Sequence, residues 1–272
     1  MTASGPGTFA RLWPIAVVAA LLLGASAPVW LGWFEPHLFL TLNHALAALG
    51  TGLWAALSLL GNGWGLLALS APLLVLAPRL MWAWLCAAPF ASLLARGVKA
   101  WLQSPRPAAV LDATQFHILG EPLHLEAFPS GHTVTAFAAA TALYLAINTT
   151  GTGRRALWLF ALATGAGLSR IAVGAHWPGD VLAGAALGLI AGGMGHALWQ
   201  RMNPSWFRPA ARPQWLLALL LGATAYTLGT EPLDFVENSL VQQLLLGLVV
   251  LSLLAFAAQV WRAHQKPMDP RS

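Results

Sequence analysis

The chain has 272 residues, of which 58% are hydrophobic and only 8% are charged, and its formal net charge is +5. Soluble domains carry about 25% charged residues, so this composition excludes an ordinary soluble protein. The basic residues are scattered among apolar runs and form no face that could lie along a duplex. This excludes a nucleic-acid-binding protein and favours a membrane protein with basic cytoplasmic loops.

Eight apolar runs approach the length of a membrane-spanning helix, which needs about 20 mostly apolar residues. They cover residues 12–34, 54–77, 80–101, 131–149, 156–175, 180–199, 214–230 and 239–261. No segment between them alternates like a strand. We therefore expect an all-α polytopic transmembrane bundle of about eight spans. Residues 1–200 would hold a six-helix core, and residues 201–272 two further spans and a cytoplasmic tail.

Three patterns describe the packing of these runs. Residues 35–50 are expected to form a short amphipathic helix on the outer surface. Gly184, Gly188 and Gly192 recur every four residues and would let a neighbouring helix approach closely. Tryptophans near the ends of runs are typical of an interfacial aromatic belt; they are Trp13, Trp33, Trp101, Trp158, Trp177, Trp199, Trp215 and Trp261.

The positive-inside rule orients the bundle. With both termini in the cytoplasm, ten of the fourteen Lys and Arg residues fall on the cytoplasmic side. The other four, which need a separate explanation, are Arg96, Lys99, Arg106 and Arg170. Eight acidic residues fall on the same outer face: Glu35, Asp112, Glu121, Glu126, Asp180, Glu231, Asp234 and Glu237.

The first charged cluster at this face is KAWLQSPRP, which contains Lys99 and Arg106. The prolines on either side of Arg106 indicate a turn after a helix end, so both cations can converge on one anion. Arg presents a planar fork that suits phosphate oxygens, and Lys a point charge. The alternative is that both side chains extend to lipid headgroups at the membrane surface.

The second cluster is PSGH, which begins the run at 131–149. Ser130 is placed to cap this helix, whose free N–H groups and dipole favour an anion. Gly131 lets an anion approach the backbone closely, and His132 lies in the first turn. The alternative is a capped helix with an incidental histidine.

The third cluster is SRIAVGAHWPGD, which contains Arg170, His176 and Asp180. Asp180 can cap the run at 180–199. It can also hold one nitrogen of His176, which leaves the other nitrogen free to attack an electrophile. Three cations, a helix N-terminus and two histidines on one face indicate phosphoryl transfer. The outer carboxylates form no compact oxygen cage, so we expect neither a metal nor another cofactor.

The three clusters, in this order and spacing, resemble the signature of the type 2 phosphatidic acid phosphatase superfamily of integral membrane lipid phosphatases. The resemblance covers residues 80 to 200 and implies a role for each signature residue. His176 would attack phosphorus, Asp180 would hold it, and His132 would protonate the leaving oxygen and then activate water. The phosphoryl oxygens would be bound by Lys99, Arg106, Ser130, Gly131 and Arg170.

The resemblance implies a metal-independent hydrolase in a bacterial inner membrane, with its active site on the periplasmic side. Its substrate would be a lipid phosphate or diphosphate of the undecaprenyl diphosphate, phosphatidylglycerophosphate or phosphatidic acid type. Alternatives that use the same site are a lipid A phosphatase and a lipid phosphotransferase. Membrane lipids are the expected partners, and no obligate protein partner is evident. A transporter would place polar residues at mid-depth in several spans, and the sequence has almost none.

Overall fold

The computed structural model describes residues 6–148, 156–208 and 211–265, and its regular structure in these ranges is entirely helical. The elements up to the long central loop are α1 (Pro6–Ala25), α2 (Ala27–Trp30), α3 (Pro36–Ala47), α4 (Thr51–Ser58), α5 (Gly63–Ser70), α6 (Leu73–Leu76), α7 (Pro78–Leu85) and α8 (Ala88–Leu102). They are followed by α9 (Pro107–Val110), η1 (Ala113–Gln115), α10 (Gly131–Ile147), α11 (Trp158–Ala172), α12 (Pro178–Trp199), η4 (Pro204–Phe207), α13 (Gln214–Thr230), η5 (Val236–Asn238) and α14 (Ser239–Gln265). The expected all-α class is confirmed.

The apolar run at 54–77 is not one continuous helix, so that expectation was wrong. The chain turns at Asn62, whose side chain accepts hydrogen bonds from the backbone N–H groups of Trp64 (2.9 Å) and Gly65 (3.2 Å) and so begins α5. A second break comes at Pro72, which has no N–H to continue the helix. The run is therefore divided among α4, α5 and α6.

Three helical stretches of the described residues are long and apolar enough to cross a membrane: Pro78–Val110, Pro178–Trp199 and Val236–Gln265. The pair α3 and α4, bent by 106° at the break between them, would be a fourth if it forms one span. Three other apolar helices are shorter, namely Leu12–Ala25, Gly131–Ile147 and Trp158–Ala172. The expected count of about eight spans is therefore not confirmed.

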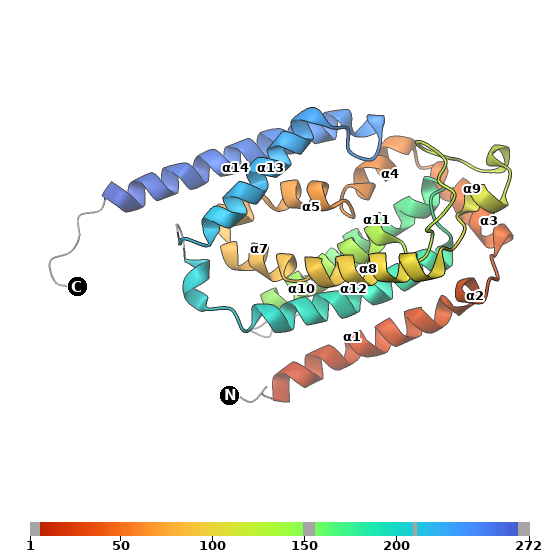
Figure 1. Cartoon of the computed structure of the whole chain (residues 1–272), viewed down its shortest axis with the longest axis horizontal. Coiled ribbons are helices and arrows are strands. Elements are labelled where there is room, and N and C mark those ends of the chain that lie inside the picture. The colour runs from red at the N-terminus through yellow and green to blue at the C-terminus, as the bar shows by residue number, and fades with distance from the viewer. Residues whose placement is uncertain (1–5, 149–155, 209–210, 266–272) are drawn as a thin grey trace.

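Helices α10 and α12 form the centre of the bundle (Figure 1). α10 packs against α12, α11, α7 and α8. α1 lies along α12, and the hairpin of α13 and α14 lies along α5 and α6. In Figure 1, α1 and this hairpin flank the central helices from opposite sides, and the turn between α13 and α14 reaches the same end of the bundle as α4 and α9.

The glycine stripe of α12 lets a neighbouring helix approach closely, as the sequence predicted, and the structure shows that this helix is α10. A Cβ atom added at Gly188 would lie 2.5 Å from Cβ of Phe137 and 2.7 Å from the carbonyl oxygen of Val134. Cβ atoms added at Gly184 and Gly192 would meet α10 equally closely. Only hydrogen at these positions allows the two backbones to approach this far.

The core has two parts that bear on the site. In the larger, Leu67 of α5, Trp84 of α7 and Val134 of α10 pack with Leu221 and Val249 of the C-terminal hairpin. The hairpin thus shares its hydrophobic core with the rest of the bundle. The smaller part lies beneath the 103–130 loop and contains Phe39, Phe116, Phe128 and Trp177, among others.

Two tryptophans expected at the membrane interface are instead core residues. Trp177 is fully buried, stacks on Phe34 with ring centroids 5.2 Å apart, and donates from Nε1 to the carbonyl of Pro105 at 2.9 Å. Trp199 is also buried. The other six remain exposed: Trp13, Trp33, Trp101, Trp158, Trp215 and Trp261.

The short helix expected at 35–50 is present as α3, and one side of it is anchored in the protein while much of the rest is exposed. Phe39 and Asn43 are fully buried. The amide of Asn43 donates to the carbonyls of Ile171 (2.9 Å) and Ala172 (3.2 Å), at the end of α11. These bonds satisfy the last carbonyls of α11 and fix its end, where Arg170 lies.

The α10–α12 contact predicts a difference between two chemically identical substitutions. Gly188→Ala should lower the midpoint of thermal unfolding in detergent, because overpacking costs about 1–3 kcal/mol. Gly222→Ala should leave the midpoint unchanged or raise it, since a Cβ at Gly222 of α13 meets nothing within 4 Å. Equal midpoints for the two variants would contradict the close packing.

Candidate active site

The three motif clusters meet at one end of the bundle, where α8 ends and α10 and α12 begin. Lys99 lies in the last turn of α8, and Arg106 directly precedes α9. His132 is the second residue of α10, Arg170 lies in the last turn of α11, and His176 lies in the loop before α12. Segments far apart in sequence therefore present all these side chains at the same end.

Lys99 and Arg106 converge, as the turn between them predicted. Nζ of Lys99 (2.7 Å) and Nη2 of Arg106 (3.3 Å) both donate to the carbonyl of Glu126. Nε of Arg106 donates to the carbonyl of Leu125 at 2.7 Å. Arg106 is buried, with 8% of its surface exposed, so its guanidinium points into the protein and the alternative of extension to a headgroup is wrong for this residue.

His176 lies between a cation and a carboxylate. Its Nε2 is 3.4 Å from Nη1 of Arg106, and its Nδ1 is 3.4 Å from Oδ2 of Asp180. The latter contact lacks hydrogen-bond geometry, and Oδ2 also accepts the backbone N–H of Trp177 at 2.8 Å. Nδ1 of His176 and Oδ1 of Asp180 are buried without a hydrogen-bond partner among the described residues. Such contacts are often long before substrate binds and tighten afterwards.

Burial and the nearby charges of Arg106 and Arg170 hold the pKa of His176 well below its ordinary value. The imidazole is therefore neutral at physiological pH. With the proton on Nδ1, toward Asp180, the lone pair lies on Nε2, beside the Arg106 guanidinium. A neutral imidazole oriented in this way can act as a nucleophile toward an anion that Arg106 binds.

The start of α10 differs in one respect from the sequence prediction. Ser130 precedes the helix, but its hydroxyl makes no capping bond; it accepts a hydrogen bond from Oγ1 of Thr133 at 2.9 Å. The backbone N–H of Ser130 donates to the carbonyl of Asp180 at 3.0 Å, which joins the starts of α10 and α12. The atom nearest to a Cβ added at Gly131 is Cε of Lys99, at 3.9 Å. The uncapped start of α10 thus lies beside the Lys99 side chain, where an anion can bind.

The other two predicted groups, Arg170 and His132, are linked through residues that no motif contains. Nη1 of the buried Arg170 donates to Oγ of Ser58 at 2.7 Å. Oγ of Ser58 donates in turn to Oδ2 of Asp234 at 3.0 Å, and Nε2 of His132 lies 3.1 Å from the same oxygen. Nδ2 of Asn62 donates to Oδ1 of Asp234 at 2.9 Å.

Sequence reasoning assigned no role to Ser58, Asn62 or Asp234. The only signal was topological: Asp234 was expected at the same face as the motifs. In the structure the α4–α5 turn packs closely on His132, since a Cβ at Gly61 would lie 2.6 Å from Cβ of His132.

Two cavities adjoin His132. A cleft of about 670 Å³ has Lys99, Gly131 and His132 at its polar end and Trp84 and Leu220 among its apolar lining. A hollow of about 300 Å³ is lined by Leu119, His132, Arg170, Asp234 and Phe235, among others. The cleft places an anion site next to an apolar surface. This combination suits a lipid whose headgroup carries a phosphate.

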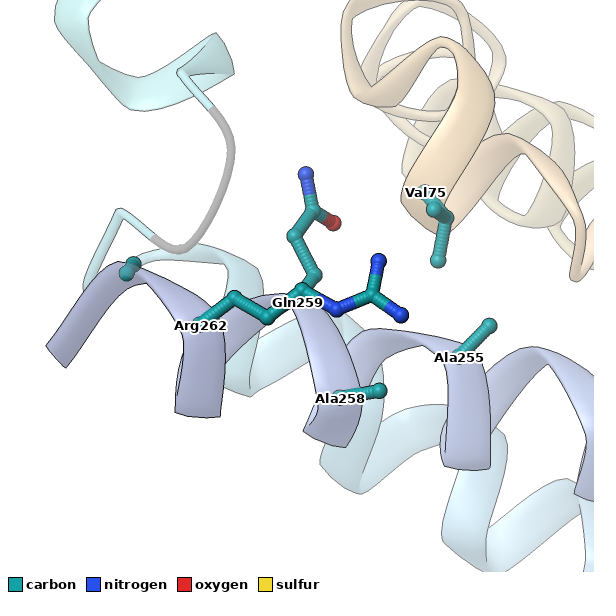
Figure 2. A pocket seen from close by; sticks show the side chains of 6 residues that line it. Val75, Ala255, Ala258, Gln259 and Arg262 are labelled. Atoms are coloured by element: carbon teal, nitrogen blue, oxygen red, sulfur yellow. The ribbon is translucent and has the colours of Figure 1, made fainter. Parts of the chain in front are cut away.

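A third cavity, also of about 670 Å³, lies toward the C-terminal end of α14 and contains none of the site residues. Figure 2 shows it between Val75 and α14, with the Arg262 side chain extending into it. Among the described residues, no group of three or more His, Cys, Asp or Glu side chains could hold a metal ion. At the candidate site, the side chains of Lys99, Arg106 and Arg170 and the backbone N–H groups at the start of α10 can balance the charge of a phosphate.

Comparisons with known proteins identify a family and several relatives. The PAP2 superfamily matches residues 80–204. The lipid A 1-phosphatase of Porphyromonas gingivalis is 42% identical over 73 residues, which are 25% of this chain and 15% of that protein. The lipid A 1-phosphatase of Rhizobium etli is 39% identical over 103 residues, which are 36% of this chain and 41% of that protein. The chain thus spans less than half the length of these relatives.

A solved structure covers more of the fold. The crystal structure of Aquifex aeolicus LpxE is similar with a TM-score of 0.51 and 30% sequence identity. The similarity covers 58% of this chain and 92% of that one. The similarity thus includes nearly the whole of the LpxE chain, whereas the sequence matches above include less than half of each relative. This chain belongs to the PAP2 superfamily, the family that its three motifs resembled.

Proposed function

We propose that this chain is an integral membrane phosphatase that removes phosphate from a lipid through a phosphohistidine formed on His176. The observation that carries the proposal is the position of His176, buried between Arg106 and Asp180 and neutral. His132, the other histidine of the site, has a carboxylate at Nε2, whereas His176 lies between a carboxylate and a guanidinium.

In the first step, the lipid phosphate lies among Lys99, Arg106, Arg170 and the N–H groups at the start of α10. These groups stabilise the charge on the equatorial oxygens in the transition state. Nε2 of His176 attacks phosphorus, the phosphorus–oxygen bond to the lipid breaks, and the leaving oxygen takes a proton from His132.

In the second step, His132 removes a proton from water, and the resulting oxygen attacks phosphorus. The phosphorus–nitrogen bond breaks and inorganic phosphate leaves. Asp180 stabilises the positive charge on His176 while the phosphohistidine exists. Ser130 and Gly131, at the start of α10, help to bind the phosphoryl oxygens through the backbone.

Among the candidate substrates we favour the 1-phosphate of lipid A, because the matched relatives from two genera are named lipid A 1-phosphatases. This was an alternative in the sequence analysis. Undecaprenyl diphosphate, phosphatidylglycerophosphate and phosphatidic acid remain the other candidates. A related possibility, transfer of phosphate from His176 to a second lipid, differs only in the acceptor of the second step.

We further propose that the protein lies in a bacterial inner membrane with the site on the periplasmic side and both termini in the cytoplasm. The distribution of basic residues supports this orientation. In this arrangement the eight apolar runs correspond to about eight passages through the membrane. Residues 1–200 form the phosphatase core, and residues 201–272 add the hairpin of α13 and α14 and a tail.

His176→Ala should reduce lipid phosphate turnover at least about 10³-fold, because the nucleophile is lost. The protein should still fold, with an unchanged elution volume in size-exclusion chromatography. Wild-type protein quenched during turnover in alkaline denaturant should carry a base-stable, acid-labile phosphate on His176, detected by mass spectrometry at alkaline pH. Residual activity above a few per cent of wild type would remove His176 as the nucleophile.

A substrate panel tests the choice of lipid. Purified protein should release phosphate fastest from lipid A, measured as kcat/KM with identification of each product, and more slowly from the three alternative lipids. Gly222→Ala, which lies outside this cleft and adds a Cβ that meets nothing within 4 Å, is the matched control and should keep the same order of substrates. Formation of a newly phosphorylated lipid without free phosphate would replace the hydrolase by a phosphotransferase.

Chelation tests the expected independence of metals. Turnover should be unchanged in excess EDTA, because Lys99, Arg106 and Arg170 supply the positive charge that a metal supplies elsewhere. Vanadate should inhibit, since it takes up the five-coordinate geometry of the phosphoryl group. Complete loss of activity in EDTA, followed by recovery with Mg²⁺, would overturn this part of the mechanism.

A further inference from the structure

The loop between α13 and α14 brings a carboxylate to one of the two histidines of the site. Oδ2 of Asp234 lies 3.1 Å from Nε2 of His132, although 102 positions separate the two residues in the chain. Asp234 lies beyond residue 204, where the PAP2 superfamily match ends. The contact therefore comes from a part of the chain that carries no family motif.

Asp234 lies on an exposed loop, but its carboxylate points inward and is held by three side chains. Its side chain is only 13% exposed. Oδ2 also accepts from Ser58, and Oδ1 accepts from Asn62. Burial raises the pKa of Asp234, but the hydrogen bond and charge of His132 and the hydrogen bond from Asn62 hold it below its ordinary value. Asp234 is therefore ionised, and an ionised carboxylate accepts a proton rather than donating one.

The loop itself is fixed by hydrogen bonds and by packing. Gln242 of α14 accepts from the backbone N–H of Leu233 at 2.9 Å and donates to the carbonyls of Leu228 and Glu231, each at 2.7 Å. The ring of Phe235 lies 5.7 Å from the Arg170 guanidinium carbon. Such a loop can hold a side chain in one orientation, which a positioning role requires.

The contact between Asp234 and Nε2 of His132 leaves Nδ1 as the nitrogen that can exchange a proton with the substrate. Because an ionised carboxylate can only accept, a hydrogen bond at this contact requires the hydrogen on Nε2 of His132. Nδ1 makes no hydrogen bond to the described residues. The imidazole lines both the cleft at Lys99 and the hollow at Arg170. The charged groups that act on it are Arg170 of α11, Lys99 of α8 and Asp234, and the neutral His176 is the other titratable group nearby.

We propose that Asp234 is a positioning residue that forms a second carboxylate–histidine pair in the site, beside Asp180 and His176. It keeps the Nε2 proton of His132 in place and stabilises the imidazolium form. Nδ1 then gives its proton to the leaving oxygen and later takes one from water, while Nε2 stays protonated. This inference rests on the proposed phosphatase function and deepens it by naming what controls the acid and base.

Asp234→Asn tests the proposal without disturbing the backbone, because Asp234 has a φ of 55° and asparagine tolerates this left-handed region well. For lipid phosphate, kcat should fall about 10- to 10³-fold with little change in KM, since a neutral amide stabilises the imidazolium less. The alkaline limb of the kcat–pH profile should move to lower pH, because losing the carboxylate favours neutral imidazole. Glu237→Gln, an exposed acidic residue of η5, is the matched control and should behave as wild type.

Two measurements separate positioning from a purely structural role. The burst of p-nitrophenolate from p-nitrophenyl phosphate, whose leaving group needs no proton, should be nearly unaffected in Asp234→Asn. In a His132→Ala background, Asp234→Asn should cause no further loss of kcat, because both changes remove the same function. Multiplicative losses, or an equally reduced burst, would show that Asp234 acts only through the fold.

Other outcomes are equally decisive. Increased activity in Asp234→Asn would mean that the carboxylate competes with phosphate for Arg170, and would overturn the proposal. Full activity in Asp234→Asn with none in His176→Ala would overturn it while leaving the phosphatase function intact. If wild type releases phosphate from no lipid, the proposed function fails. The tautomer of His132, read from imidazole nitrogen chemical shifts, still tests the Asp234 contact, and a hydrogen on Nδ1 alone would contradict it.

Discussion

Charged groups buried in an apolar bundle are stable only when each has a partner, and this requirement organises the site end of the protein. Arg170 is held by Ser58 of α4, and Arg106 by carbonyls of the 103–130 loop. Asp180 is held by the backbone of Trp177. The same contacts that satisfy these charges therefore join α4, the loop and the start of α12, so that the residues proposed to bind phosphate also fix the surrounding elements relative to one another.

The positions of His132 and His176 relative to each other are fixed because α10 and α12 are in close contact along the glycine stripe. His132 is in the first turn of α10, and His176 precedes α12 by two residues. The hydrogen bond from the N–H of Ser130 to the carbonyl of Asp180 joins these two helix starts directly. Backbone contacts therefore place the proposed nucleophile and the proposed acid at the same end, and side-chain packing only has to set their orientation.

The C-terminal hairpin of α13 and α14 lies outside the region that matches the family, yet it is part of the core and of the site. Leu221 and Val249 pack with residues of α5, α7 and α10. Its turn contributes Asp234 to His132 and the ring of Phe235 to Arg170. A segment outside the matched region thus contacts a residue of the candidate site without containing a motif of its own.

The sequence by itself determined the helical class, the glycine-mediated contact of α12 and the presence of Lys99, Arg106 and His176 at one end of the bundle. These features depend on apolar runs and on short spacings, which are local properties of the chain. Only the tertiary structure decided the division of residues 54–77, the burial of Trp177, the partner of the Ser130 hydroxyl and the pairing of Asp234 with His132. These depend on which distant segments pack together, and no local pattern of residues contains that information.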